Sequence, residues 1–145
     1  MSMNWPADIS LMHQKFGVNE VLRSLDKDQL RSFLEFRRKF LQEELDEMQK
    51  AVIDFDAGTI DASKAADDVV DALIDLCVVA IGTLNAYDVN PYEAWDRVHQ
   101  KNLEKEVGIK ASRPNPLGLP DLIKPEGWTP PSHADNVGIL SKVFE

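Results

Sequence analysis

One segment constrains the fold of this chain more than any other. Residues 63–84, SKAADDVVDALIDLCVVAIGTL, are apolar on almost every side when they are placed on a helix. A helix of this kind needs other helices over most of its surface. A chain of 145 residues with 43% hydrophobic residues can form one domain with a real core, so the sequence predicts an all-α bundle. The few helices of one small chain leave part of this surface uncovered, which favours a homodimeric bundle.

Three aspartates interrupt this apolar helix on one side. At 100° per residue, Asp68, Asp71 and Asp75 share a stripe roughly 60° wide, whereas Asp67 points toward solvent. A carboxylate that faces a core is costly unless it is neutralised, paired or bound to a metal. The chain supplies few basic residues in phase with these aspartates. The stripe is therefore a candidate functional feature.

The preceding helix, predicted for residues 28–55, carries a second acidic stripe in the segment LQEELDEMQKA (41–51). Glu44 falls inside the apolar sector, between Phe40 and Met48, and Glu43 and Glu47 fall just outside it. Asp46 points to solvent, so only part of the acidic run is a solvated face.

Two acidic stripes on adjacent helices form an oxygen-ligand set suited to hard divalent cations such as Mg²⁺ or Mn²⁺. The alternative is an acidic seam that is open to water at one end of the bundle. A di-iron carboxylate bundle fits less well, because it requires a Glu-x-x-His motif on each of two helices. The nearest match here is a single Asp96-x-x-His99.

The remaining helices are predicted from caps and periodicity. Residues 5–17 are expected to form a helix with Ile9, Met12 and Phe16 on one stripe, and this helix ends at Gly17. Ser63 is predicted to cap the apolar helix, which runs to about Tyr87.

A further helix starts at NPYE (90–93), with Asn90 as N-cap and Pro91 in the first turn, and ends near Gly108. Residues 112–132 hold six of the eight prolines, so no long helix and no strand is expected there. We therefore expect a helical domain over residues 1–108 and a C-terminal irregular strap over residues 109–145, packed on the same domain or on a neighbouring subunit.

The composition excludes several classes of protein. A net charge of -9 argues against a protein that binds a nucleic-acid backbone by itself. The apolar run Val78–Ile81 is too short to span a membrane, and the N-terminus lacks the pattern of a signal peptide. The single cysteine, Cys77, is consistent with a reduced core thiol. We expect a soluble cytoplasmic protein.

Four segments resemble a known superfamily: EELDE (43–47), DALIDLCVVAIGTL (71–84), AWDRVHQKNLEK (94–105) and KPEGWTPP (124–131). Over residues 9–131 the chain is similar to the all-α nucleoside triphosphate pyrophosphohydrolases. This superfamily includes MazG-like enzymes and phosphoribosyl-ATP pyrophosphohydrolase, and the resemblance is to a branch common in bacteria and their phages. It implies a MazG-like helical bundle that assembles as a homodimer or a dimer of dimers.

The resemblance also implies a reaction, the Mg²⁺-dependent hydrolysis of a nucleoside triphosphate to the monophosphate and pyrophosphate. The superfamily signature is EExxE followed by ExxD on the next helix. Three residues before Asp75 stands Ala72 rather than Glu. Either Asp71 and Asp75 form the pair, or Asp68 and Asp71 do.

The site residues follow from the same resemblance. Two or three Mg²⁺ ions (or Mn²⁺) would be held by the six acidic residues Glu43, Glu44, Glu47, Asp68, Asp71 and Asp75. Either Glu43 or Glu44 would orient or deprotonate the attacking water. Asn102 and Lys105, in H-x-x-N-x-x-K, would contact phosphate or sugar.

Three further residues are candidates for substrate binding. Arg37 shares the face of Glu44 and is expected either to reach a phosphate or to form a salt bridge with a glutamate. His13 is a candidate contact to the nucleobase, and Trp128 is expected either to cover the pocket or to dock the strap.

The sequence leaves the substrate open among dUTP, dCTP and a purine dNTP such as dGTP, for shaping or sanitation of the nucleotide pool. Phosphoribosyl-ATP is the alternative substrate. The non-enzymatic alternative is a helical dimerisation module whose acidic seam binds divalent cations structurally.

Overall fold

The computed structural model describes residues 1–118 and 121–145, which form two compact units. Residues 1–91 and 137–145 make up the first unit, and residues 92–136 make up the second. The all-α prediction is confirmed, with one small two-stranded sheet as the exception.

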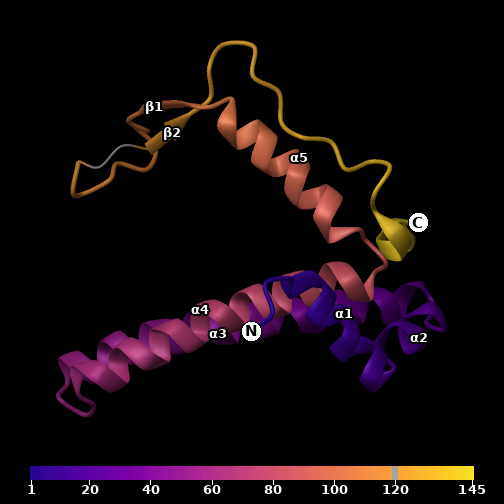
Figure 1. Ribbon diagram of the computed structural model, residues 1–145, viewed down its shortest axis with the longest axis horizontal. Helices are drawn as coiled ribbons and strands as arrows, with labels where there is room; N and C mark the ends of the chain where they lie inside the picture. Colours follow the sequence, from indigo (N-terminus) through magenta and orange to yellow (C-terminus); the bar gives the residue numbers. More distant parts are fainter. Residues whose placement is uncertain (119–120) are drawn as a thin grey trace. The chain divides into compact units, whose positions relative to one another are not determined.

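Two long helices, α3 (Lys27–Asp56) and α4 (Ala62–Ala86), lie side by side in the first unit (Figure 1). Helix α3 starts with a capping box, in which the Asp26 side chain accepts from the Gln29 amide at 2.9 Å and the Gln29 side chain accepts from the Asp26 amide at 3.0 Å. Helix α4 is capped by Asp61, which accepts from the Lys64 amide at 2.8 Å. The predicted cap at Ser63 is wrong, because the preceding turn ends early enough for Asp61 to take that role.

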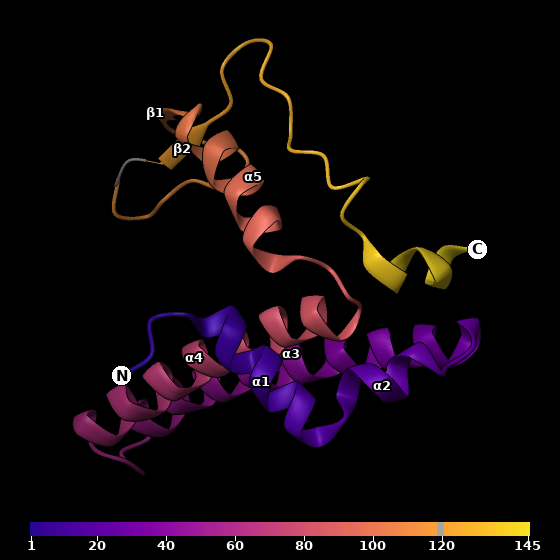
Figure 2. The same cartoon turned by 45° about the vertical axis from the view of Figure 1, so that its right-hand side comes forward.

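Helix α1 (Trp5–Phe16) packs against α4, and α2 (Val18–Arg23) follows it (Figure 2). Gly17 ends α1 at φ 69°, as predicted. Of the residues on the apolar stripe, Ile9 is buried but Phe16 is 68% exposed. The buried partner of Ile9 is His13, one turn later. Periodicity defines a sector of the helix, but the position of α4 decides which edge of that sector is covered.

The core of the first unit lies where α2, the start of α3, the end of α4 and the C-terminal 3₁₀ helix η1 (Gly138–Phe144) meet. It comprises Leu22, Leu30, Ala86, Tyr87, Val89 and Val143. The Ile139 amide donates to the Tyr87 carbonyl at 2.9 Å. Gly138 has φ 52°, and a Cβ there would lie 2.0 Å from the same carbonyl oxygen. Only glycine allows this approach, which joins the C-terminus to the first unit.

The second unit contains α5 (Pro91–Leu103) and the strands β1 (Glu106–Gly108) and β2 (Asp121–Ile123). Pro91 starts α5 as predicted, but α5 ends before Gly108 because residues 106–108 pair with β2. The strands are antiparallel, with Val107 opposite Leu122. A side chain at Gly108 would meet Ile123 Cδ1 at 2.6 Å. The prediction of no strand is therefore wrong, since a pairing between distant segments leaves no local pattern.

Candidate functional site

Carboxylates from α3 and α4 gather along the seam between these helices. Glu44 is half-buried, and its Oε2 atom has neither solvent contact nor a hydrogen-bond partner among the described residues. Burial raises the pKa of Glu44, and the nearby negative charges add to the increase, in the order Glu47, Asp75, Asp71 and Glu43. The seam therefore joins three carboxylates of α3 to two of α4.

Asp68 has a different environment from the other two aspartates of its stripe. Its Oδ1 accepts a hydrogen bond from Lys64 Nζ at 2.5 Å. It is not among the charges that raise the pKa of Glu44, whereas Asp71 and Asp75 are. Of the two aspartate pairs that the sequence allows, Asp71 with Asp75 is therefore the pair whose two charges both raise the pKa of Glu44.

The donor set of this seam fits a hard divalent cation. Within residues 1–118 and 121–145, no three His, Cys, Asp or Glu side chains converge closely enough to hold an ion as they stand. Unpaired carboxylates repel one another, and a cation supplies the attraction that draws such oxygen ligands together. The buried Oε2 of Glu44 is an acceptor that such a cation would satisfy. The residues present are therefore compatible with Mg²⁺.

Arg37 lies in the same unit and contacts α4. Its Nε donates to Thr83 Oγ1 at 3.0 Å, and its Nη2 donates to the Val79 carbonyl at 3.0 Å. Burial lowers the pKa of Arg37. No ion pair joins Arg37 to a glutamate in the part of the chain that the structure describes. Of the two expected roles, the salt bridge is thus not found.

His13 is buried beside Arg37. Its Nδ1 lies 2.8 Å from Asn85 Oδ1, which accepts the proton that this ring nitrogen carries. Burial lowers the pKa of His13 more than this hydrogen bond raises it, and the charge of Arg37 lowers it further. The imidazole is therefore neutral at pH 7.

Gly82 lies in the segment DALIDLCVVAIGTL (71–84), but no individual role was predicted for it. A Cβ at this position would lie 2.7 Å from Arg37 Nη2 and 3.2 Å from His13 Nε2. Helices α1, α3 and α4 therefore meet here because position 82 has no side chain. An isolated glycine within an apolar helix is the signal that indicates such a close approach.

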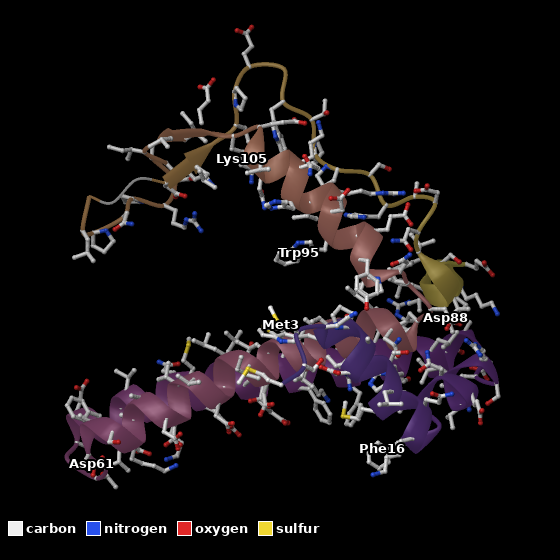
Figure 3. All side chains as sticks on the ribbon, in the orientation of Figure 1. Met3, Phe16, Asp61, Asp88, Trp95 and Lys105 are labelled. Atoms are coloured by element: carbon white, nitrogen blue, oxygen red, sulfur yellow. The ribbon has the colours of Figure 1, made fainter. Side chains whose placement is uncertain are left out.

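In the second unit, Lys105 contacts the other two candidate residues, Asn102 and Trp128. Figure 3 labels Lys105. Lys105 Nζ donates to Asn102 Oδ1 at 2.8 Å and lies 5.4 Å from the centroid of the Trp128 ring. Trp128 Nε1 donates to the Lys101 carbonyl at 3.0 Å, which fixes the indole on the end of α5. The docking role of Trp128 is thus seen directly.

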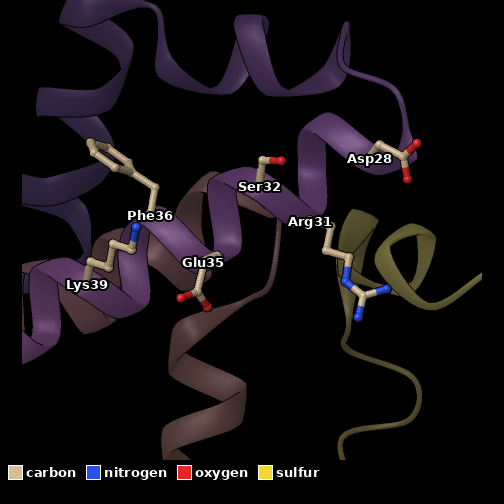
Figure 4. A pocket seen from close by; sticks show the side chains of 6 residues that line it. All are labelled: Asp28, Arg31, Ser32, Glu35, Phe36 and Lys39. Carbon is tan, nitrogen blue, oxygen red and sulfur yellow. The ribbon is translucent and has the colours of Figure 1, made fainter.

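Two surface hollows lie elsewhere on the first unit. The first is on α3 (Figure 4) and is lined by Asp28, Arg31, Ser32, Glu35, Phe36 and Lys39. Glu35 is nine residues from Glu44, so the two lie about 180° apart around the helix. The hollow is therefore not part of the carboxylate seam. The second is an apolar groove between α1 and α4, lined by Trp5, Asp8, Ile9, Ile74, Cys77, Val78 and Ile81.

Helix α4 is long and apolar enough to cross a membrane by length and composition alone. It packs along α3 and against α1, and it carries Asp71 and Asp75 on the seam. These contacts are those of a helix inside a helical bundle.

The observed helical bundle is consistent with the MazG-like nucleoside triphosphate pyrophosphohydrolases, the superfamily to which the family match assigns the chain. Within this class, residues 19–102 match the family described as phosphoribosyl-ATP pyrophosphohydrolase. This match covers more than half of the chain, and the chain belongs to this family. A search of curated proteins gave no match.

Family membership confirms the resemblance and the class of reaction. The protein is a pyrophosphohydrolase that acts on a nucleotide-like substrate, in a family that generally uses divalent metal ions. The family consists of soluble metabolic enzymes, which favours a cytoplasmic protein.

Proposed function

We propose that this protein hydrolyses a (deoxy)nucleoside triphosphate to the monophosphate and pyrophosphate, with Mg²⁺ bound along the seam of α3 and α4. The observation that carries the proposal is the environment of Glu44, which has an unpartnered buried Oε2 and carboxylate neighbours on two helices. A purely structural surface would place lysines between such charges.

The ligands that we assign are Glu43, Glu44 and Glu47 of α3 with Asp71 and Asp75 of α4. Mg²⁺ held by these oxygens would neutralise charge on the triphosphate and polarise its phosphoryl groups. Asp68 is left out of this set because Lys64 already neutralises it. Water attacks the α-phosphorus, the bond between the α-phosphorus and the bridging oxygen breaks, and pyrophosphate leaves. Glu43 and Glu44 are the candidates for orienting that water and accepting its proton.

Phosphoribosyl-ATP is the second candidate substrate, and the family match over residues 19–102 is the observation that favours it. The chemistry at the α-phosphorus is the same for both substrates. The two differ in the bulk attached to the base, so binding of the base decides between them.

The test is a panel of NTPs, dNTPs and phosphoribosyl-ATP incubated with the protein and Mg²⁺, with products separated by anion exchange. Monophosphate with an equal amount of pyrophosphate from one or two dNTPs supports the proposal. If only phosphoribosyl-ATP is hydrolysed, the substrate is phosphoribosyl-ATP and not a nucleoside triphosphate. Release of orthophosphate without pyrophosphate would refute the reaction.

Variants on α4 separate a catalytic seam from a structural one. Asp75→Asn is expected to abolish Mg²⁺-dependent turnover, and Asp67→Asn, an exposed control on the same helix, is expected to leave it unchanged. Asp68→Asn distinguishes the two aspartate pairs and should retain most of the activity. If Asp75→Asn retains full turnover, the seam is not catalytic.

The functional unit is proposed to be a homodimer, either alone or as half of a dimer of dimers. Several large apolar side chains on α3 and α4 are exposed in the single chain, namely Val52, Ile53, Phe55, Val70, Leu73 and Ile74. Such surfaces exceed what isolated exposed residues explain and are typical of association sites. Light scattering coupled to size exclusion tests this, and a monomer at micromolar concentration would contradict it.

A further inference from the structure

The N-terminal helix α1 is held to the first unit by few buried side chains. All residues of α1 are described, and its buried residues are Ile9 and His13. The other large apolar side chains of α1 are exposed, namely Trp5, Leu11, Met12 and Phe16. A helix with so few buried contacts separates from its fold at a lower free energy than global unfolding requires. The docking of α1 against α4 therefore depends on one aliphatic side chain and one titratable side chain.

His13 is placed so that a proton on its second ring nitrogen would face a positive charge. Its Nδ1 is engaged with Asn85 Oδ1 at 2.8 Å. Its Nε2 and Arg37 Nη2 both lie within 3.2 Å of the position that a Cβ would take at Gly82, so less than about 6 Å separates the two nitrogens. Two positive charges at this distance repel each other in a buried site. The docked position of α1 therefore suits the neutral imidazole and not the imidazolium.

The surroundings of the ring are not free to adjust to a second positive charge. Arg37 is fixed to α4 by its hydrogen bonds to Thr83 Oγ1 and to the Val79 carbonyl. The backbone carbonyl of Asn85 accepts from Asn19 Nδ2 at 2.6 Å, which joins this end of α4 to α2. Movement of α1 itself is therefore the way to relieve the repulsion.

No negative charge offsets Arg37 at the ring in the part of the chain that the structure describes. Arg37 is the one charged group there that acts on the pKa of His13, and it lowers that pKa. Residues 78–86 of α4 include no titratable side chain. The charged side chains of α1 and α2 do not act on the ring, and these are Asp8, Lys15, Glu20 and Arg23.

Gly17 provides a hinge about which α1 can move by itself. It has φ 69°, and a Cβ there would meet no atom within 4 Å. Helix α2, which follows it, is anchored by Leu22 in the core and by Arg23, whose Nη2 lies 2.8 Å from Asp88 Oδ1. Helix α1 can thus leave α4 while the rest of the first unit keeps its packing.

We propose that α1 is an acid-released helix: protonation of His13 against the fixed Arg37 detaches α1 from α4 about Gly17 and uncovers the groove that contains Cys77. This device goes beyond the proposed function and does not rest on it.

The direction of the pH effect follows from the two states of the helix. Burial, and in addition the charge of Arg37, lower the pKa of His13 when α1 is docked, whereas the ordinary value of 6.5 applies when α1 is detached. Docking is therefore fully stable above pH 6.5. It weakens as the pH falls below that value, until the lowered pKa is reached.

Cys77 reports on the docking of α1, because it is half-buried in the groove that Trp5, Asp8 and Ile9 of α1 cover. The test measures the rate at which 4,4′-dithiodipyridine modifies Cys77 in the full-length protein between pH 7.5 and pH 5. Each rate is divided by the rate for the urea-unfolded chain at the same pH, so that ionisation of the thiol cancels. A pKa lowered by one unit changes the docking equilibrium tenfold, so we expect the normalised rate to rise by about threefold to tenfold in acid.

Two variants separate His13 from other acid effects. In His13→Asn the side-chain amide can still donate to Asn85 but does not titrate in this range, so the normalised rate should not rise in acid. Arg37→Met keeps the titratable ring and removes the facing charge, so the rise should be smaller and should begin at higher pH. His99→Asn, at an exposed histidine of the second unit, is the matched control and should respond like the wild type. A wild type without an acid response, or equal responses in the wild type, His13→Asn and Arg37→Met, would refute the proposal.

Hydrogen exchange locates the movement. After correction for the intrinsic effect of pH on exchange, peptides from α1 should exchange faster at pH 5.5 than at pH 7.5, and peptides from α2 should not change. Equal acceleration in α1 and α2 would indicate general acid destabilisation and would overturn the hinge at Gly17. Neither measurement uses a nucleotide or Mg²⁺, so failure of the proposed function leaves this test intact.

Discussion

Replacement of Gly82 by alanine tests whether the close meeting of α1, α3 and α4 is real. In an ordinary helix interior this change stabilises the fold by about 1 kcal/mol, because alanine is the better helix former. Here the new Cβ would lie 2.7 Å from Arg37 Nη2 and 3.2 Å from His13 Nε2.

The cost follows from what those atoms do. The end of an arginine side chain can usually move aside, but Nη2 is held by the Val79 carbonyl and Nε by Thr83. Moving it breaks a charge-assisted hydrogen bond worth about 1.5–3 kcal/mol, and overpacking costs about 1–3 kcal/mol. After the gain in helix propensity, we expect a net loss of about 2–4 kcal/mol, or a Tm lower by roughly 5–15 °C for a chain of this size.

The assay is urea unfolding at one fixed protein concentration, supported by thermal unfolding. Ala66→Gly, at an exposed position of the same helix, is the control and should cost about 1 kcal/mol through propensity alone. In an Arg37→Met background, Gly82→Ala should cost clearly less, because the main obstacle has changed. If Gly82→Ala raises the stability by about 1 kcal/mol, the packing described here is refuted.

Three further outcomes follow from individual contacts. Glu44→Gln should stabilise the metal-free protein by a few tenths of a kcal/mol, because it removes one of several carboxylates that repel one another. The same change should abolish the stabilisation that Mg²⁺ gives in thermal unfolding, and an unchanged stabilisation by Mg²⁺ would contradict the assignment. Tyr87→Phe should cost about 1–2 kcal/mol in urea unfolding, because the hydroxyl donates to the Leu30 carbonyl at 2.5 Å in the core. Hydrogen bonding to Arg23 lowers the pKa of Asp88. This contact therefore stabilises the fold at pH values above the ordinary carboxyl pKa, and that stabilisation is lost as the pH falls through the lowered pKa. Asparagine tolerates the backbone at φ 58°, so Asp88→Asn tests the ion pair with Arg23 alone. The variant should lower the free energy of unfolding by about 0.5–1 kcal/mol at pH 7, and its difference from the wild type should disappear in acid. A difference that persists at pH 2 would refute the assignment.

Much of the helical architecture could be predicted from local sequence. The cap at Gly17, the start of α5 at Pro91 and the extent of α3 follow from propensities and capping that act within a few residues. The inward position of Glu44 also follows, because the helical period fixes its angle relative to Phe40 and Met48. The acidic seam is therefore encoded in the helical period of the chain.

Other features could not be predicted, because they depend on partners distant in the sequence. The pairing of β1 with β2 and the contact between Gly138 and the Tyr87 carbonyl join segments that no local pattern connects. The choice of Asp61 over Ser63 as the cap of α4 depends on where the preceding turn ends. The burial of His13 in place of Phe16 depends on where α4 lies against α1.

By itself, the sequence determined the class of fold, the two acidic stripes and the family to which the chain belongs, because helical periodicity and residue type are properties of the chain alone. Only the tertiary structure shows that the charges of Asp71 and Asp75 act on Glu44, whereas Asp68 forms an ion pair with Lys64. It also placed Lys105 and Lys124 within cation–π distance of the Trp128 ring. These relations depend on distances in space between separate segments, and the folded packing alone sets those distances.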